Sequence, residues 1–251
     1  MNVEPPSGSD LAPAGPTLQV YMLGAVEFEA ALAFQRRLAY DIAGDRTRAV
    51  LILCEHPSPL ITVGRQGSRS HILCDPAEMR ARQWRVRWVN RGGGCLLHLP
   101  GQLAVYPVLA LDQLGLGLQA FLERLQQVVI DVLAEFGVRG EMQPRNAGVW
   151  AGKRLIAGVG LAVRDWVSYY GAYLNVNPAL DAFRLVRCGG PAEAPMTSLE
   201  RERRGPLRPA LARQRLLEHF AARFGFSQLS FFSDHPTLCR KAPPNAVASR
   251  T

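Results

Sequence analysis

One glycine-rich stretch, residues 91–107, constrains the fold more than any other part of the chain. It reads RGGGCLLHLPGQLAVYP: an arginine with three glycines, a short apolar run ending at His98, a Pro-Gly turn and a second apolar run. Consecutive glycines let a ligand or another backbone approach closely, and the Pro-Gly turn predicts a hairpin-like connection between two strands. Exposed N–H groups beside Arg91 suit an anionic or carbonyl-rich ligand. A glycine-rich hairpin that only turns the chain gives the same pattern.

Strand and helix patterns follow one another along the rest of the sequence. Apolar runs predict strands over residues 18–23, 49–54, 60–65, 84–89, 102–111 and 168–176, and a strand-turn-strand unit over 147–163. Helical spacing of apolar residues predicts helices over 26–42, 75–83, 118–136 and 207–224. The run at 49–54 is nearly continuous, which is typical of a strand buried on both faces. We expect an α/β protein of the α+β type: a mixed sheet with helices on one face, and a smaller sheet that completes a pocket.

The sequence predicts one folded domain with a less ordered segment at each end. Residues 1–16 are rich in Pro, Gly and Ser and predict a disordered tail. Residues 17–228 are expected to form a single catalytic-type domain, and residues 229–251 a loose C-terminal tail. No run approaches the roughly 18 apolar residues that span a bilayer, and no signal-peptide pattern opens the sequence. We therefore expect a cytoplasmic protein without a membrane partner.

Charge and cysteine usage narrow the function classes further. The formal net charge is +8, and lysine occurs only at positions 153 and 241. No arginine run is interleaved with aromatic residues, so a nucleic-acid partner is not expected. The charge can steer acidic protein partners, although a GC-rich genome that substitutes arginine for lysine explains much of it. The cysteines are odd in number and widely spaced, which argues against a disulfide framework or a metal site: Cys54, Cys74, Cys95, Cys188 and Cys239.

Cys188 is the candidate nucleophile because Gly189 and Gly190 follow it and leave its thiol approachable. A thiolate is a strong nucleophile once its pKa is lowered, but a lone cysteine is more often inert. Arg91 either contacts a ligand or closes its turn, and His98 either orients a substrate or fills the core. We expect His56 to hold its loop, and the tryptophans to lie in the core: Trp84, Trp88, Trp150 and Trp166.

In their order and spacing, these motifs resemble the lipoyl(octanoyl) transferase family, whose fold is that of the biotin and lipoate protein ligases. The resemblance covers roughly residues 18–224. It is carried by EHP at 55–57, TVGR at 62–65, RGG at 91–93 with His98, PGQLAVYP at 100–107, GVW at 148–150, Gly171 with LNVN at 174–177, and CG at 188–189.

The resemblance implies an octanoyltransferase, an acyltransferase of lipoate biosynthesis and protein lipoylation. Family members move an octanoyl group from octanoyl-acyl carrier protein onto a cysteine, here Cys188, as a thioester. They pass it to a lysine of a lipoyl domain, in 2-oxoacid dehydrogenases or the glycine cleavage H protein. Transfer from thioester to amide is downhill, so no ATP, cofactor or metal is expected. The matching substrate-binding positions are Arg91, Gly92, Gly93, Gly94, Cys95, Leu96, Leu97, His98, Gly158, Val159, Gly160, Gly171, Ala172 and Tyr173.

The sequence departs from the family at one chemically important position. The family's lysine, whose ammonium lowers the pKa of the cysteine, corresponds to Leu155, which cannot stabilise a thiolate. In a strand Lys153 would share the face of residue 155, whereas Arg154 would point the other way, so Lys153 is the possible substitute. The pocket wall is also more apolar, because Leu96 and Leu97 replace the usual Thr-Tyr.

Two other functions stay open. The loss of the lysine is compatible with a catalytically weakened paralogue that binds acyl groups or lipoyl domains without transferring anything. An ATP-dependent lipoate or biotin ligase is less favoured, because that class commonly needs a lysine beside the phosphate and because Cys188 is present.

Overall fold

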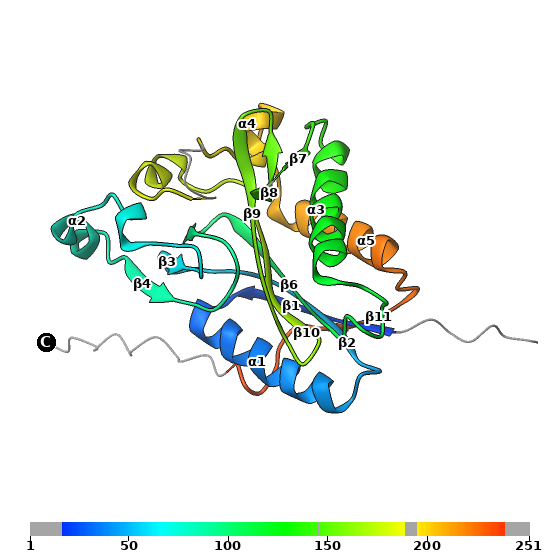
Figure 1. The fold of residues 1–251 in the computed structure, drawn as a ribbon. Helices are drawn as coiled ribbons and strands as arrows, with labels where there is room; N and C mark the ends of the chain where they lie inside the picture. Colours follow the sequence, from blue (N-terminus) through cyan, green and yellow to red (C-terminus); the bar gives the residue numbers. More distant parts are fainter. Residues whose placement is uncertain (1–16, 145, 189–194, 239–251) are drawn as a thin grey trace, which may run out of the picture.

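The computed structural model describes residues 17–144, 146–188 and 195–238 (Figure 1). Cys239 and the predicted tail over residues 1–16 lie outside the described residues. Two sheets and five α-helices make up the described part, with two short 3₁₀ turns. The helices are α1 (Phe28–Gly44), α2 (Pro76–Ala81), α3 (Leu118–Glu135), α4 (Leu199–Arg203) and α5 (Pro209–Phe224), and the turns are η1 (Arg69–His71) and η2 (Leu180–Leu185).

The larger sheet has eight strands in the described residues, in the order β11-β1-β2-β6-β10-β9-β8-β7. β1 pairs in parallel with β2 and β11, and the other neighbours pair antiparallel. The mixed sheet is therefore as predicted. Its strands are β1 (Thr17–Ala25), β2 (Ala49–Glu55), β6 (Gln102–Leu109), β7 (Glu141–Gln143), β8 (Asn146–Ala151), β9 (Arg154–Arg164), β10 (Val167–Asn175) and β11 (Gln228–Phe232).

The predicted smaller sheet is also present, with three strands in the order β4-β3-β5. They are β3 (Leu60–Val63), β4 (Arg85–Trp88) and β5 (Cys95–His98). β5 passes directly into β6 of the larger sheet through a turn at Gly101, where φ is +87°. A methyl group at Gly101 would lie 2.7 Å from Oδ1 of Asn177. Glycine is thus required at the point where the two sheets join.

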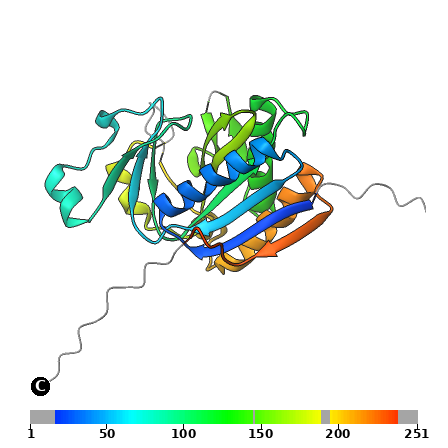
Figure 2. The same cartoon turned by 90° about the horizontal axis from the view of Figure 1, so that it is seen from below.

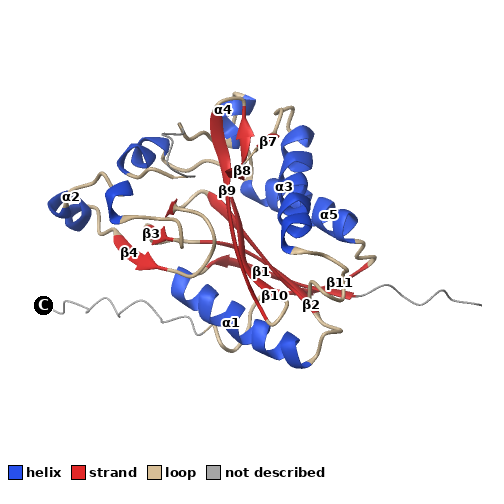
Figure 3. Ribbon diagram, in the orientation of Figure 1, coloured by secondary structure: helices blue, strands red, loops and turns tan. Residues whose placement is uncertain are grey.

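The helices cover both faces of the larger sheet, not one (Figures 1 and 2). α3 and α5 pack together on one face as expected, over Leu51 and Leu53 of β2. α1 covers the opposite face, over Val50 and Ile52 of the same strand. Neighbouring residues of a strand point to opposite faces, so a strand that is apolar at every position needs cover on both sides. Figure 3 shows this arrangement, with helices on either side of the strands.

The predicted helices form, with their ends shifted by one or two residues. The C-terminal prediction is wrong in part, because Gln228–Phe232 forms β11 and pairs in parallel with β1. This strand lies at the sheet edge with Phe231 exposed, so it lacks the alternating pattern by which a strand is recognised. Two tryptophans are also not in the core: Trp88 is 61% exposed and Trp166 is 56% exposed.

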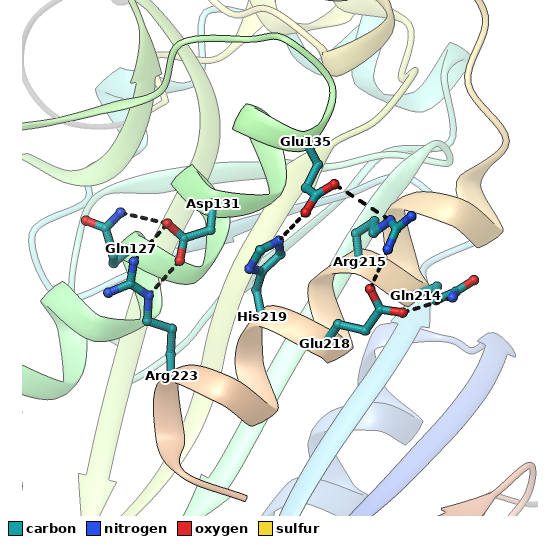
Figure 4. A network of polar contacts seen from close by, with 8 residues as sticks. All are labelled: Gln127, Asp131, Glu135, Gln214, Arg215, Glu218, His219 and Arg223. Carbon is teal, nitrogen blue, oxygen red and sulfur yellow. Dashed lines mark hydrogen bonds and ion pairs between the residues drawn. The ribbon is translucent and has the colours of Figure 1, made fainter. Parts of the chain in front are cut away.

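Ion pairs join α3 to α5 on the outside of the molecule (Figure 4). Arg223 donates from Nε and Nη2 to the carboxylate of Asp131, at 2.6 and 3.0 Å. His219 contacts Glu135 at 3.2 Å. These groups are partly exposed, so each pair contributes little, about 0–1 kcal/mol. The helices are held mainly by the apolar cluster beneath them, which includes Phe121.

We expect Gly171→Ala to destabilise the fold strongly. A methyl group at this position of β10 would overlap the carbonyl oxygen of Val105 in β6, and backbone cannot move aside cheaply. The free energy of unfolding in urea should fall by about 3 kcal/mol. The control, Gly44→Ala, adds a methyl group where nothing lies within 4 Å, and should change that free energy by less than about 0.5 kcal/mol. Equal stability of the two variants would contradict the packing described.

Candidate active site

The guanidinium of Arg91 is buried and holds the glycine stretch in place. Arg91 is 1% exposed. Its Nη1 donates to the carbonyl oxygens of Gly92 and Gly94, both at 3.0 Å. Its Nη2 donates to the carbonyl oxygen of Thr62 at 3.0 Å and to the Thr62 hydroxyl at 2.7 Å. These four acceptors offset the cost of removing the charge from water. Arg91 therefore closes its turn, which was one of the two roles that its sequence context left open.

The ionisable groups that act on Arg91 are thiols and phenols. Burial lowers the pKa of the guanidinium, and Tyr173, Cys188, Cys95 and Tyr170 act in the opposite direction. An arginine nevertheless stays protonated in proteins. Nε of Arg91 has no hydrogen-bond partner among the described residues. The site therefore holds a buried positive charge that a thiolate or an oxyanion could neutralise.

Two glycines make room for this side chain. A methyl group at Gly160 of β9 would lie 2.8 Å from Cδ of Arg91 and 3.0 Å from the carbonyl oxygen of Gly92. A methyl group at Gly64 would lie 2.7 Å from Nη1 of Arg91 and overlap the carbonyl oxygen of Gly93. Both positions need glycine because another backbone approaches closely there.

Thr62 connects Arg91 to His98. Its hydroxyl accepts from Arg91 and lies 2.8 Å from Nε2 of His98. Burial lowers the pKa of His98 well below its usual value, and His56 and Arg91 lower it further, so the ring is neutral. We assign the tautomer in which the Thr62 hydroxyl donates to Nε2 and the ring proton is on Nδ1. The Nδ1 atom has no hydrogen-bond partner among the described residues. The Nδ1–H group is then a buried donor that a substrate oxygen could accept from.

Three predicted segments come together around these side chains. Leu96 of β5 packs against Gly158 of β9, where a methyl group would lie 2.7 Å from Leu96 Cδ2. The ring centroids of His98 and Tyr173 are 4.4 Å apart. The three residues of β9 pair with three of β10: Gly158 with Tyr173, Val159 with Ala172, and Gly160 with Gly171. The predicted substrate segments 91–98, 158–160 and 171–173 are therefore neighbours.

Cys188 lies beside the same strand but belongs to a different apolar cluster. It forms a parallel bridge with Cys95 of β5, and both pack in the cluster that contains Leu97. Because strand residues alternate, Leu96 and His98 point to the opposite face of β5. The structure thus places Cys188 next to the predicted pocket, along β5, and not on the face of His98.

The thiol of Cys188 is buried and protonated in this structure. It is 2% exposed, and burial raises its pKa to about 12. The backbone N–H of Leu97 donates to its sulfur and lowers the pKa, as does the charge of Arg91, whereas Cys95 raises it. The sulfur therefore has a hydrogen-bond donor and a cation nearby, but desolvation outweighs both.

Comparison with known proteins identifies the family. The lipoyl protein ligase A/B catalytic domain matches residues 27–221. An octanoyltransferase of Geobacter metallireducens is 42% identical over 177 residues, which are 70% of this chain and 79% of that protein. An octanoyltransferase of Gloeobacter violaceus is 44% identical over 168 residues, 66% of this chain and 73% of that protein.

This chain belongs to the octanoyltransferases of the lipoyl protein ligase A/B family. The resemblance found in the sequence is confirmed. Solved structures share the fold: a lipoate-protein ligase A bound with ATP superposes with a TM-score of 0.66 at 17% identity, covering 87% of this chain and 88% of that one. A bipartite lipoate protein ligase of Thermoplasma acidophilum gives 0.64 at 18% identity, covering 87% and 86%.

Position 155, to which the sequence resemblance assigns the lysine of the family, has apolar surroundings in the structure. Leu155 is buried in β9, contacts the position of Gly148 and forms a parallel bridge with Met196. Lys153 is exposed in the turn before β9. Arg154 forms an ion pair with Glu202 at 2.7 Å. Among the described residues, Arg91 is the basic group that lowers the pKa of Cys188.

An arginine-rich cavity of about 580 Å³ opens beside the segment that leads to Cys188. Val186 and Met196 line it together with four arginines and one aspartate: Arg154, Arg184, Arg187, Arg201 and Asp181. In this octanoyltransferase the cavity lies beside Val186, two residues before Cys188, and two of its arginines form ion pairs: Arg154 with Glu202, and Arg184 with Asp181.

Two polar contacts in the site were not predicted from the sequence. Thr62 was part of a motif without an assigned role, although a threonine within the apolar strand β3 is a usable signal for a buried hydrogen bond. Tyr106 was placed only in a strand, yet its hydroxyl lies 2.6 Å from Nε2 of His56. His56 also contacts the carbonyl oxygen of Val26 at 2.7 Å, which confirms that it holds its loop.

We expect stability to fall as the pH drops below about 6.5. Burial lowers the pKa of His98 and of His56, so the unfolded chain binds protons near its usual histidine pKa of 6.5 that the folded chain does not. Each group then contributes stability above that pH, lost at up to about 1.4 kcal/mol per pH unit below it. Urea unfolding of wild type and His98→Gln between pH 8 and 5 measures this. An unchanged slope in the variant would show that His98 is not held neutral.

Proposed function

We propose that this chain is an octanoyltransferase of lipoate biosynthesis that carries the octanoyl group as a thioester on Cys188. Octanoyl transfer follows from its similarity to curated octanoyltransferases over most of its length. The observation that carries the role of Cys188 is its place along β5, with the Leu97 N–H on its sulfur and the buried charge of Arg91 acting on it.

The first step loads Cys188. The thiol loses its proton, and the thiolate attacks the carbonyl carbon of octanoyl-acyl carrier protein. The carbon–sulfur bond to the carrier breaks, the carrier leaves as a thiolate that takes up a proton, and octanoyl-Cys188 remains. Negative charge develops on the carbonyl oxygen during this attack and needs donors placed for it. The buried charge of Arg91, which acts on Cys188, supplies such a field beside β5.

The second step releases the product. The ε-amine of a lipoyl-domain lysine attacks the thioester, an amide bond forms, and the Cys188 sulfur leaves and regains its proton. The amide is more stable than the thioester, so the step needs no ATP. The apolar residues that pack in one cluster with Cys188, among them Leu97 and Val186, suit the hydrocarbon chain. The lipoyl domain of a 2-oxoacid dehydrogenase or the glycine cleavage H protein is the acceptor we expect, and the cytoplasm the location.

The weak point of this chemistry is the first deprotonation. With the pKa of Cys188 near 12, only a very small fraction of the free enzyme carries the thiolate at pH 7. Leu155 brings no charge to offset this. The structure therefore favours a slow enzyme in which Arg91 takes over part of the electrostatic role of the family's lysine. The second candidate, a binder that does not transfer, rests on the same two observations.

Incubation with octanoyl-acyl carrier protein should add an octanoyl group to the protein, detected by intact-mass spectrometry. The adduct should be absent in Cys188→Ala and present in Cys54→Ala, which removes a thiol buried between β2 and α1. Hydroxylamine should release the octanoyl group, as it does for thioesters. Saturable binding of the carrier without any adduct would instead support the non-transferring protein.

Leu155→Lys should lower the pKa of Cys188 and accelerate octanoyl transfer. An ammonium at position 155 of β9 adds a positive charge at a buried position that is apolar in the wild type. The rate of iodoacetamide alkylation of Cys188 against pH measures the pKa, and Leu155→Met serves as the uncharged control. No difference between the lysine and methionine variants would show that another group already activates the thiol.

The arginine-rich cavity is expected to recognise an acidic carrier protein. Arg184→Glu combined with Arg201→Glu should raise KM for octanoyl-acyl carrier protein about tenfold at low salt, because steering by opposite charge is lost. Arg37→Glu combined with Arg139→Glu makes the same charge change at two exposed positions outside the cavity and should alter KM less than twofold. The difference should shrink at high ionic strength. Equal effects of the two sets would place the carrier elsewhere.

A further inference from the structure

Cys95 and Cys188 are paired across two neighbouring backbone segments. The bridge between them is parallel, and both side chains are buried in one apolar cluster. Paired residues of adjacent strands point to the same face and lie about 4.8 Å apart in the direction of the hydrogen bonds. A disulfide needs a Cα–Cα distance of about 4.4–6.8 Å. The bridge therefore places the two Cα atoms at a spacing that a disulfide can span.

No other pair of the described cysteines has this relation. Cys54 belongs to β2 and packs on the face covered by α1. Cys74 shares the cluster of Cys188, but its segment is bonded three residues before Cys188: the N–H groups of Leu73 and Cys74 both donate to the carbonyl oxygen of Leu185. Cys74 is therefore the natural competitor in any test of the pairing.

We propose that Cys95 and Cys188 form a reversible intramolecular disulfide, so that the pair is an oxidation site that masks the thiol at position 188. The existence of this bond does not depend on what the protein catalyses. Its consequence does: loss of octanoyl transfer on oxidation rests on the proposed function.

The oxidant we assign is a hydroperoxide. One thiol is oxidised by hydrogen peroxide to a sulfenic acid, and one water leaves. The second thiol attacks that sulfur, the sulfur–oxygen bond breaks, a second water leaves, and the disulfide remains. Two thiols have then lost two electrons to the peroxide. An external dithiol reverses the reaction by thiol–disulfide exchange and becomes a disulfide itself.

Burial sets the rate and the direction of this chemistry. The pKa of both thiols is raised by desolvation, and thiolates are the species that react with peroxide. Oxidation should therefore be slow at pH 7 and faster at pH 9. Once formed, the bond is removed from water with the rest of its cluster, so small thiols should reduce it more slowly than an exposed disulfide.

The test uses the full chain, oxidised with hydrogen peroxide and then alkylated under denaturing conditions. The intact mass should show two cysteines fewer alkylated than in the reduced protein, and peptide mapping should find the Cys95 peptide joined to the Cys188 peptide. Dithiothreitol should restore both alkylation sites. Cys74→Ser should form the same link, whereas Cys95→Ser should not.

Several results would overturn the proposal. They are a link from Cys188 to Cys74, an oxidised Cys188 with Cys95 still free, or full alkylation of both cysteines after peroxide treatment. Octanoyl transfer is followed in parallel in wild type and should fall on oxidation and return with dithiothreitol. If the link forms and no transfer is found in the reduced protein, the disulfide stands and the proposed function fails, so the two failures are distinguishable.

Discussion

The site depends on one buried cation. Arg91 donates to the carbonyl oxygens of Gly92, Gly94 and Thr62 and to the Thr62 hydroxyl, and so ties the glycine stretch to β3. The N–H of Gly92 in turn donates to Leu161 of β9 at 2.8 Å. The side chain of Arg91 therefore fixes the glycine stretch, and the backbone of that stretch bonds the large sheet. Its charge also acts on the thiol that we assign as the acyl carrier.

The two-sheet arrangement explains why residues far apart in sequence meet here. β5 belongs to the small sheet and continues directly into β6 of the large sheet. One face of β5 meets the glycines of β9, and its free edge meets Cys188. Arg91 lies between β3 and Gly160 of β9, and its charge also acts on Cys188. Leu155 is apolar, and among the described residues Arg91 is the cation that lowers the pKa of Cys188.

Local patterns of apolar residues predicted most of the helices and strands. They did not predict pairing between strands that are far apart in the sequence. The apolar run at 49–54 and the stripe of α3 are local signals, and both elements form nearly where expected. A strand that is apolar at every position, such as β2, needs apolar cover on both faces of the sheet. The apolar run at 49–54 therefore already argued against a sheet with helices on one face only. β11 could not be recognised because it is held by pairing with β1, not by its own pattern. Motif order located the segments of the site, but the neighbours of Arg91 and the contact of Cys95 with Cys188 exist only in the folded chain.

The most direct test of the role of Arg91 is amide hydrogen exchange in wild type and Arg91→Met. Replacement by methionine removes the four hydrogen bonds that the guanidinium donates while keeping an unbranched side chain. We predict that exchange accelerates at Gly64, Arg65 and Gln66, whose N–H groups bond the glycine stretch, and stays unchanged at Val128 and Val129 inside α3. Unchanged protection of the Gly64 segment in the variant would contradict the account, because the site would then be held together without its buried cation.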